Sequence, residues 1–366
     1  MRIAINCRSI LLPQRTGIGR YTYQLLDSLG ELDRADEYIL HAPKRLFDLK
    51  RRLPDFSRYK NFKDRPDYFN RGPGRNDIYH LPSPDDHSWR ESKLVVTIHD
   101  LIYKTHPQSH TPQTIELTEK YMRAIAARAD QIICVSENTR RDLHTFFSIL
   151  PAKTCVIYNG VDHRTFFPLS EEQRREPLSQ LAGLGINRPY VLSVGTIEPR
   201  KNLTGLLQSF AQLKARKAFH GQLVVVGMKG WMQDNIESVI GPLGLKGDVI
   251  FTGFITDTQL RSLYNLAELF VFPSFYEGFG FPILEAFCCG VAVVTSKTSS
   301  CGEIAGQAAL TVDPQDPAQI AGAMTQILQD KTLKRSLQQA GLKRAREFSF
   351  AAMARGTLAV YQQVIK

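Results

Sequence analysis

Short apolar runs alternate along the chain with longer segments in which apolar residues recur every three or four positions. The short runs lack polar alternation, which is typical of parallel strands buried on both faces, whereas the longer segments have the period of helices. Strands are predicted at residues 2–6, 93–98, 131–135, 154–158, 190–194, 222–226, 248–251, 269–272, 291–295 and 309–312. Helices are predicted at residues 19–29, 113–127, 137–147, 202–215, 258–267 and 317–329. Strands interleaved with helices in this way predict a doubly wound α/β fold.

The predicted strands are too many for one sheet of ordinary size, which has about five or six strands. The polar segment 170–188 interrupts the pattern, and a new strand begins after it. We therefore expect two Rossmann-like domains, over residues 1–170 and 187–348, with a last helix over 349–366 that packs back on the first domain. Two facing sheets of this kind form an inter-domain cleft at the carboxyl ends of their strands, where α/β proteins bind ligands. Functional residues are therefore expected in the loops that follow strands.

Basic residues are concentrated in one part of the chain. The sequence of 366 residues carries a formal net charge of +10, and residues 41–75 hold eleven Lys and Arg against four Asp, which is +7. Such an excess favours an acidic partner, which is a nucleic acid, an anionic membrane surface or a phosphorylated ligand. Because aromatic residues are interleaved with these cations, we predict contact between 41–75 and an anionic membrane, with a solvated loop as the alternative. No recognition module for nucleic acid accompanies the charge, so no nucleic-acid partner is expected.

The six cysteines show neither a CxxC pair nor a ligand spacing shared with histidines. We therefore expect buried free thiols in a reducing compartment and no zinc site. The first residues have the pattern of a strand rather than of a signal peptide, and no apolar run approaches the ~18 residues that cross a membrane. These features predict a cytoplasmic protein, and the basic stretch leaves open a peripheral position on the inner face of the cytoplasmic membrane.

A loop between a predicted strand and a predicted helix carries two acids. Gly278, Gly280 and Pro282 exclude a continuous helix here, and Pro suits the first turn of a helix, so Glu277 lies on the loop and Glu285 in the helix. The amides of such a loop and the helix N-terminus suit anionic or polar oxygen ligands, and carboxylates accept hydrogen bonds from a vicinal diol. A ligand with phosphates and sugar hydroxyls satisfies both features. The alternative is that the two acids are ordinary acidic residues near a helix N-terminus and bind no ligand.

Two cations follow the first predicted strand of the C-terminal domain. Arg200 and Lys201 lie between this strand and a predicted helix, where a guanidinium fork and an ammonium suit a diphosphate. The segment is neither a Walker loop nor a GxGxxG motif, which argues against a nicotinamide cofactor. A solvated basic turn is the alternative.

The N-terminal domain offers weaker signals. Gly17 and Gly19 follow the first strand and open a helix, where the absence of side chains lets a ligand approach the backbone. His99 follows the predicted strand 93–98, and in this fold it would point into the cleft. A plain turn and a core histidine are the respective alternatives.

Taken together and in order, these motifs resemble the retaining nucleotide-sugar glycosyltransferases of the GT-B fold, specifically glycosyltransferase family 4, over essentially the whole chain. The spacing from Glu277 to Glu285 is that family's E-x7-E signature. The other matching motifs are Gly17-Ile-Gly-Arg20, His99-Asp100, Val135-Ser-Glu137, Asn159-Gly-Val-Asp162 and Glu198-Pro-Arg-Lys-Asn202. The form of the last motif resembles a sub-branch rich in transferases that build bacterial surface polysaccharides, often with mannose from GDP-mannose, while users of UDP-glucose occur across the family.

The resemblance implies a role for each motif. Glu285 would hold the ribose hydroxyls of the donor, and Glu277 would face the donor sugar and the reaction centre. Arg200 and Lys201 would bind the diphosphate and stabilise its negative charge as it leaves. His99 would lie near the transferred sugar. The resemblance also implies that the donor contacts Thr196 and the backbone amides of Gly278, Phe279, Gly280 and Phe281. Gly17 and Gly19 would admit the phosphates or the acceptor.

This chain departs from the family pattern in one place. Many members have an arginine where Thr196 follows Gly195, and Arg200 would supply that cation here. No Asp-x-Asp metal motif occurs in a plausible loop, so neither a cofactor nor a metal is expected, and the cations would do what a metal does elsewhere. Front-face attack with leaving-group assistance and a short-lived ion pair both remain open as the origin of retention.

The expected function is transfer of a hexose, mannose or glucose, from GDP-mannose or UDP-glucose to a saccharide or lipid-linked acceptor. A nucleotide-sugar epimerase, a phosphorylase on the same fold and a catalytically silent sugar-nucleotide-binding paralogue remain as alternatives. Turnover of the donor without an acceptor would indicate an epimerase, and phosphate-dependent cleavage would indicate a phosphorylase.

Overall fold

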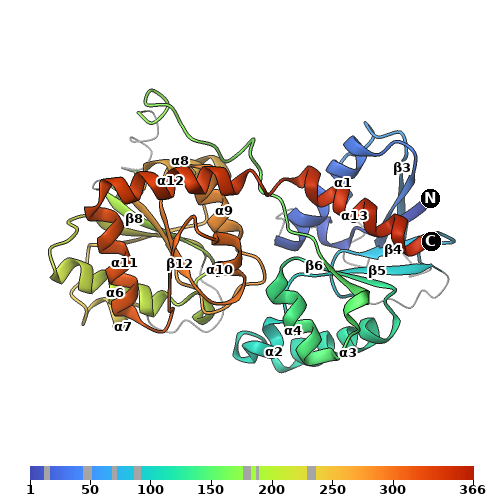
Figure 1. Cartoon of the computed structure of the whole chain (residues 1–366), viewed down its shortest axis with the longest axis horizontal. Coiled ribbons are helices and arrows are strands. Elements are labelled where there is room, and N and C mark those ends of the chain that lie inside the picture. The colour runs from blue at the N-terminus through green and yellow to red at the C-terminus, as the bar shows by residue number, and fades with distance from the viewer. Residues whose placement is uncertain are drawn as a thin grey trace. The chain divides into compact units, whose positions relative to one another are not determined.

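The computed structural model describes residues 1–11, 17–43, 52–67, 72–85, 92–175, 183–186, 189–228 and 236–366 (Figure 1). The chain divides into two compact units, the first formed by Met1–Gly160 and Ser349–Lys366 and the second by Val161–Phe348. The division therefore falls at Gly160, before the polar segment 170–188 in which the sequence pattern placed it. In that segment, residues 176–182 and 187–188 lie outside the described residues.

The first unit is built on a seven-stranded parallel sheet with the order β3-β2-β1-β4-β5-β6-β7. Its strands are β1 (Arg2–Asn6), β2 (Glu37–Pro43), β3 (Phe62–Asp67), β4 (Ile78–Leu81), β5 (Lys93–Ile98), β6 (Gln131–Cys134) and β7 (Thr154–Val156). Its helices are α1 (Gly17–Leu32), α2 (Ile102–Thr105), α3 (Pro112–Arg128), α4 (Glu137–Phe147) and α13 (Phe350–Ile365).

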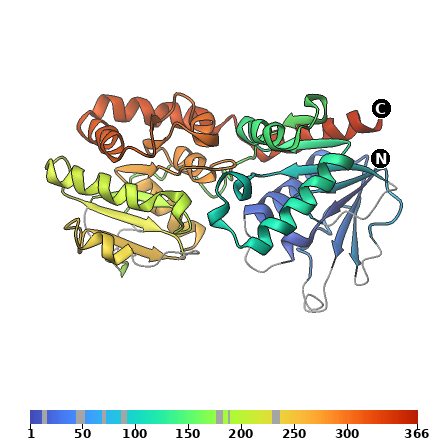
Figure 2. The same cartoon turned by 90° about the horizontal axis from the view of Figure 1, so that it is seen from below.

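Alternate residues of these strands enter two different cores. Ile5 and Val95 pack on the side where α1 and α13 lie together, as Figures 1 and 2 show. Leu94 and Val96 pack on the other side, against Met122 and its neighbours on α3. Helices on both faces explain why the strands read as continuous apolar runs.

Three strands of this sheet, β2, β3 and β4, were not predicted from the sequence. β3 is an edge strand with largely exposed, charged residues and a proline, which an edge position tolerates. β2 and β4 are buried, but His41 and His80 interrupt their apolar runs. Both kinds of strand lack the uninterrupted apolar run on which the prediction depends.

The second unit is built on a six-stranded parallel sheet with the order β10-β9-β8-β11-β12-β13. Its strands are β8 (Tyr190–Val194), β9 (Gln222–Val226), β10 (Val249–Gly253), β11 (Leu269–Phe272), β12 (Val293–Ser296) and β13 (Leu310–Val312). Its helices are α6 (Leu203–Ala215), α7 (Ile236–Ile240), α8 (Asp257–Leu266), α9 (Phe281–Cys288), α10 (Ser299–Ala305), α11 (Pro317–Gln329) and α12 (Lys331–Ala345). The strand order runs outward in both directions from the pair β8 and β11, so the topological switch point of this sheet lies between them.

The predicted α/β class is confirmed, because every strand and helix predicted from the sequence occurs within a few residues of its expected bounds. The chain returns to the first unit at Ser349, just before α13 begins. Met353 and Tyr361 of this helix are buried in the core of the first unit. Within the described part of the chain, no helix is both long enough and apolar enough to span a membrane.

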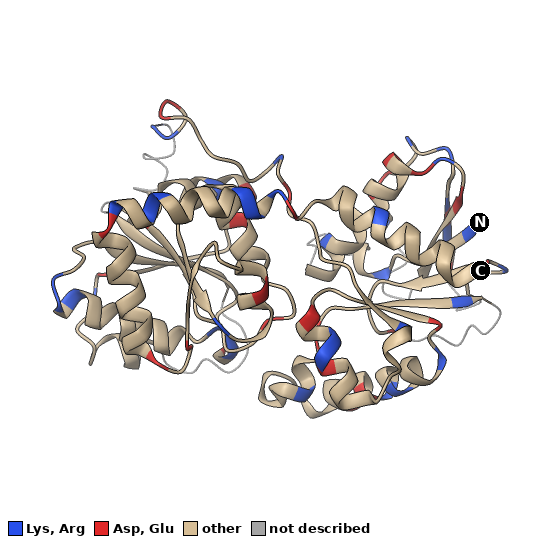
Figure 3. Cartoon of the chain, in the orientation of Figure 1, with Lys and Arg blue, Asp and Glu red and all other residues tan. Residues whose placement is uncertain are grey.

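The described part of the basic stretch 41–75 is folded onto the first unit. Phe56 and Tyr59 belong to its core, Phe62 is partly buried against that core, and the three rings contact one another. Arg58 pairs with Asp27 of α1, and Lys63 pairs with Glu37. These aromatic side chains therefore pack inside the first unit. Residues 44–51 and 68–71 of the stretch lie outside the described residues (Figure 3).

Candidate active site

Two loops meet at the switch point of the second unit. The loop after β8 forms a short 3-10 turn, Pro199–Lys201, before α6 begins, and the loop after β11 leads into α9. Asn202 joins the two loops, because its side-chain amide donates to the carbonyl oxygens of Pro273 (3.2 Å) and Pro314 (2.6 Å). Its Oδ1 accepts a hydrogen bond from the backbone amide of Gly205 and so caps the N-terminus of α6. Asn202 has the left-handed conformation (φ 57°), which Asn tolerates better than most residues.

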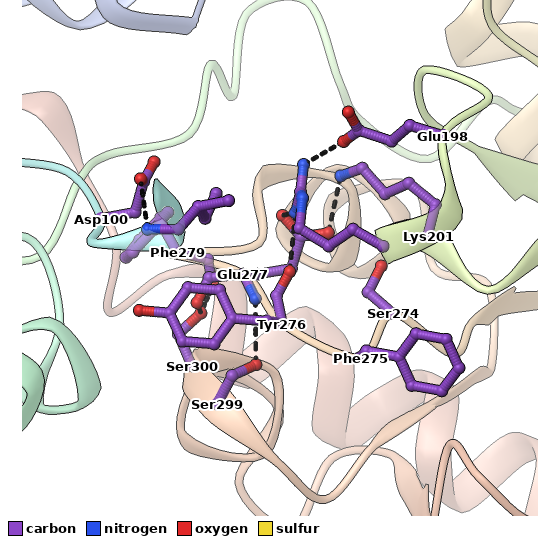
Figure 4. Close-up of polar contacts among 12 residues, drawn as sticks. Asp100, Glu198, Lys201, Ser274, Phe275, Tyr276, Glu277, Phe279, Ser299 and Ser300 are labelled. Atoms are coloured by element: carbon purple, nitrogen blue, oxygen red, sulfur yellow. Dashed lines mark hydrogen bonds and ion pairs between the residues drawn. The ribbon is translucent and has the colours of Figure 1, made fainter. Parts of the chain in front are cut away.

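A cluster of opposite charges lies where these loops meet (Figure 4). Lys201 Nζ is 2.6 Å from Glu277 Oε1, and Arg200 Nη1 is 2.8 Å from Glu277 Oε2. Arg200 also pairs with Glu198 and donates to the carbonyl oxygen of Tyr276 (2.6 Å). The sequence placed Arg200 and Lys201 on one loop and Glu277 on another, and the structure brings all three side chains together.

The cations decide the ionisation of Glu277. Burial alone would raise the pKa of this carboxyl group, but the charges of Lys201 and Arg200 outweigh burial and lower the pKa to about 2. Glu277 is therefore an anion at neutral pH and does not act as a proton donor there. The cluster holds two ordered cations, Arg200 and Lys201, and two carboxylates, Glu198 and Glu277, which accept their hydrogen bonds.

The remaining predicted positions of this unit surround the cluster. Thr196 is exposed and lines a small pocket together with Lys201, Ile197 and Phe272. Lys201 also lies over the face of the Phe272 ring, 5.0 Å from its centroid. Thr196 therefore lies on the loop after β8 and shares this pocket with Lys201.

The turn that follows Glu277 has the expected form of a loop running into a helix. Gly280 has φ 110°, a conformation that favours glycine, and α9 begins at Phe281 with Pro282 in its first turn. Phe279 and Phe281 contact each other edge to face, with ring centroids 5.1 Å apart. Gly278 lies on this same loop, beside Glu277.

Two serines that the sequence analysis did not single out hold this loop. Ser299 Oγ accepts a hydrogen bond from the amide of Glu277 (3.1 Å), and Ser300 Oγ donates to the carbonyl oxygens of Glu277 and Phe279, each at 2.8 Å. Ser299 has φ 54°, a costly conformation for a residue other than glycine. Their place at the start of a helix after a predicted strand was the signal that could have found them.

Glu285 is one turn into α9, and its side chain is buried. Tyr264 of α8 donates a hydrogen bond from its hydroxyl to Glu285 Oε2 (3.0 Å). Burial and this carboxylate both raise the pKa of Tyr264, so the phenol stays protonated and donates. Glu285 therefore has a fixed carboxylate, which is what recognition of a diol requires.

The predicted residues of the first unit lie at the carboxyl ends of β1 and β5. Gly17 begins α1, and Gly19 is buried in the first turn of that helix. His99 follows β5, and its Nε2 is 2.8 Å from the carbonyl oxygen of Pro82, which follows the neighbouring strand β4. A carbonyl oxygen only accepts, so Nε2 carries the hydrogen, and in the neutral ring Nδ1 is the acceptor. Burial lowers the pKa of His99, which keeps the imidazole neutral near pH 7.

Among the described residues, no group of three or more His, Cys, Asp or Glu side chains is arranged to hold a metal ion. The cysteines in the structure are all free, and all except Cys155 are buried.

Models of two sequence families match consecutive parts of the chain. The model described as "Glycosyltransferase Family 4" matches residues 15–165, and the model described as "Glycosyl transferases group 1" matches residues 178–344. The chain is also 30% identical to "O-antigen chain mannosyltransferase B" of Escherichia coli, with 99% of this chain and 100% of that protein covered.

Solved structures with low sequence identity share the fold. Sucrose-phosphate synthase from Thermosynechococcus elongatus has a TM-score of 0.78 at 22% identity, covering 99% of this chain and 98% of that one. Anabaena Alr3699/HepE, whose structure contains UDP and glucose, has a TM-score of 0.73 at 17% identity, covering 99% and 100%. With its two parallel sheets and whole-length likeness to these proteins, the chain has the GT-B fold, belongs to glycosyltransferase family 4 and is a glycosyltransferase.

Proposed function

We propose that this enzyme transfers mannose from GDP-mannose to a saccharide acceptor during polysaccharide synthesis, with retention of configuration and without a metal ion. The observation that carries the proposal is the pair of cations, Arg200 and Lys201, ordered by Glu277 at the switch point of the second sheet. The name of the E. coli relative supports mannose as the sugar and a polysaccharide as the product. UDP-glucose is the second candidate donor.

The cations match the charge that the reaction creates. Transfer breaks the bond between the anomeric carbon and a diphosphate oxygen and forms a bond from that carbon to an acceptor hydroxyl oxygen, whose proton is released. Negative charge grows on the diphosphate as it leaves, and the guanidinium of Arg200 and the ammonium of Lys201 would stabilise it there. Glu277 stays ionised, so in this proposal it orients the cations and accepts hydrogen bonds from the sugar.

Exposed apolar side chains on the loops after β9 and β10 support a place for the nucleoside. Met228 follows β9 and is 58% exposed, and Phe254 follows β10 and is 69% exposed. Backbone hydrogen bonds join these loops to the loop after β8, since the amide of Ile197 donates to Met228 and that of Gly227 donates to Gly253. We propose that the base lies against Met228 and Phe254, with the ribose hydroxyls on Glu285.

The donor proposal is tested by a thermal-shift panel of GDP-mannose, GDP, UDP-glucose, TDP-glucose and ADP-glucose in the presence of EDTA. A ligand that binds the folded state raises its melting temperature, by an amount that grows with the ratio of concentration to Kd. GDP-mannose and GDP are expected to give the largest shifts, and their shifts are expected to persist in EDTA. A larger shift with UDP-glucose would exchange the donor, and a shift that needs added Mg²⁺ would overturn metal independence.

Contact of the basic stretch 41–75 with an anionic membrane is proposed as the means of reaching a lipid-linked acceptor. Because Phe56 and Tyr59 are buried in the core and Phe62 packs against it, the contact would depend on cations rather than on these rings. Co-sedimentation with phosphatidylglycerol vesicles tests it, and the binding is expected to fall as salt increases. Absence of binding at low salt would overturn it.

A further inference from the structure

A buried chain of hydrogen bonds crosses the first unit from its last helix to its first. The hydroxyl of Tyr361 on α13 is 2.6 Å from His80 Nδ1, and His80 Nε2 is 2.9 Å from Thr97 Oγ1. Thr97 Oγ1 is in turn 3.0 Å from the hydroxyl of Tyr21 on α1. All four residues are at most 3% exposed, so the chain of contacts is shielded from water.

The sheet explains why these residues meet. His80 and Thr97 lie two positions after Ile78 and Val95, so they face the same side of β4 and β5, where α1 and α13 pack. Polar side chains in such a core require partners, and the two tyrosine hydroxyls supply them. Burial lowers the pKa of His80 to about 3, so the hydrogen bonds of this series join neutral side chains near pH 7.

Tyr21, the last residue of this series of hydrogen bonds, contacts the candidate catalytic residue His99. The rings of Tyr21 and His99 are 4.8 Å apart and nearly perpendicular, at 81°. His99 is thereby held at two places, by the ring of Tyr21 and by the hydrogen bond from Nε2 to Pro82. An edge-to-face contact depends on the direction of both ring planes, so an anchored Tyr21 ring restricts the His99 ring.

We propose that Tyr21 is a positioning residue for His99, and that Thr97, His80 and Tyr361 hold its hydroxyl in place. The inference rests on the proposed role of His99 beside the transferred sugar. It gives α13 a function in the reaction, since this helix anchors a residue that contacts His99 although it is the last element of the chain. The alternative is that the four residues stabilise the core of the first unit and nothing else.

Three variants separate these two possibilities. Tyr21→Phe keeps the ring and removes the hydroxyl, Thr97→Val removes its partner with little change of shape, and Thr97→Ser restores a hydroxyl. The matched control is Tyr38→Phe, because Tyr38 is another buried tyrosine of the same core, whose hydroxyl donates to Asp33 (2.6 Å). Melting temperature measures the loss of stability that all buried hydroxyl deletions are expected to cause.

The measurements are kcat, the Kd of the donor, and the NMR signals of the His99 ring in protein with labelled histidines. Tyr21→Phe and Thr97→Val are expected to shift the His99 signals and lower kcat about tenfold at unchanged donor Kd, while Thr97→Ser and Tyr38→Phe do neither. The proposal is overturned if the His99 signals stay unchanged in Tyr21→Phe or Thr97→Val, or if Tyr38→Phe shifts them equally. His99→Ala tests the proposed function separately, because full activity in that variant would exclude a role of His99 in the reaction whether or not Tyr21 orients its ring.

Discussion

The candidate residues of the two units are held in different ways. In the second unit, Arg200 and Lys201 form ion pairs with Glu277, and their charges keep the Glu277 carboxyl group ionised at neutral pH. In the first unit, His99 is held by a neutral ring and a carbonyl oxygen, and burial keeps it uncharged. Ordered charges stabilise a group whose charge changes during the reaction, such as a departing diphosphate. A neutral imidazole instead forms hydrogen bonds with a hydroxyl group that stays uncharged.

The largest effect that this comparison predicts is the loss of a cation from the second unit. Lys201→Ala should lower kcat/KM about 100- to 1,000-fold, because it removes a charge that acts most strongly as the leaving group develops. The matched control is Lys214→Ala, because Lys214 also pairs with a partly buried carboxylate of the same unit, with Nζ 3.0 Å from Asp248 Oδ2. Steady-state transfer kinetics measure the effect, and equal losses in the two variants would contradict it.

A smaller effect is expected at Glu285, the carboxylate proposed to bind the ribose hydroxyls. Glu285→Gln should weaken donor binding by about 10- to 100-fold, because a hydrogen bond to a charged group contributes about 1.5–3 kcal/mol. Since kcat at saturating donor should change little, the effect should appear in KM and in a titration of the donor. Glu268→Gln, which alters a carboxylate paired with Lys334, serves as the control. Unchanged donor affinity in Glu285→Gln would exclude it from the ribose site.

The two units should also respond differently to acid. Burial lowers the pKa of His41, His80 and His99 in the first unit, so the unfolded chain binds these protons more readily and stability falls as pH falls below about 6.5. Each histidine can remove up to about 1.4 kcal/mol per pH unit. Glu277 has a lowered pKa of about 2, so its contribution is complete above about pH 4.5 and is lost only as pH falls toward 2.

Hydrogen exchange measured between pH 7 and pH 5, with correction for the intrinsic rate, tests this difference. Amides of β4 and β5 should lose protection over this range, while those of β8 and β11 keep it. Simultaneous loss in both sheets would show that the buried histidines do not set the acid response of the first unit.

The smallest predicted effect concerns the loop that carries Glu277. Ser300→Ala removes a donor shared by two carbonyl oxygens and should cost about 1 kcal/mol of stability for each hydrogen bond lost. Because this loop continues into α9, the KM of the donor should rise about fivefold. Ser262→Ala, which removes a donor to the Thr258 carbonyl within α8, controls for loss of a buried hydroxyl. An unchanged KM would mean that the loop keeps its form without Ser300.

The sequence predicted those parts of the molecule whose signals are local. The continuous apolar runs marked ten of the strands, and the glycines and proline between Glu277 and Glu285 placed the first acid on a loop and the second in α9. The strands that it missed, β2 to β4, contain histidines or a charged edge, and their burial depends on neighbours distant in the sequence.

Contacts between distant residues could not be predicted in this way. Lys201 and Glu277 were each recognisable, but their ion pair joins loops that follow two different strands. The bond between His80 and Tyr361 spans 281 positions, and neither residue carries a local signal of it. The roles of Ser299 and Ser300 likewise depend on how α10 packs against the loop after β11.

The most direct test of the account is calorimetric titration of GDP, GMP and guanosine into the wild type and Lys201→Ala, all in EDTA. If the cations of the second unit bind the diphosphate, GDP should bind the wild type at least about tenfold more tightly than guanosine, and most of that advantage should disappear in Lys201→Ala. Equal affinity for GDP and guanosine in the wild type, or an undiminished preference for GDP in Lys201→Ala, would contradict the assignment of this cluster to the donor diphosphate.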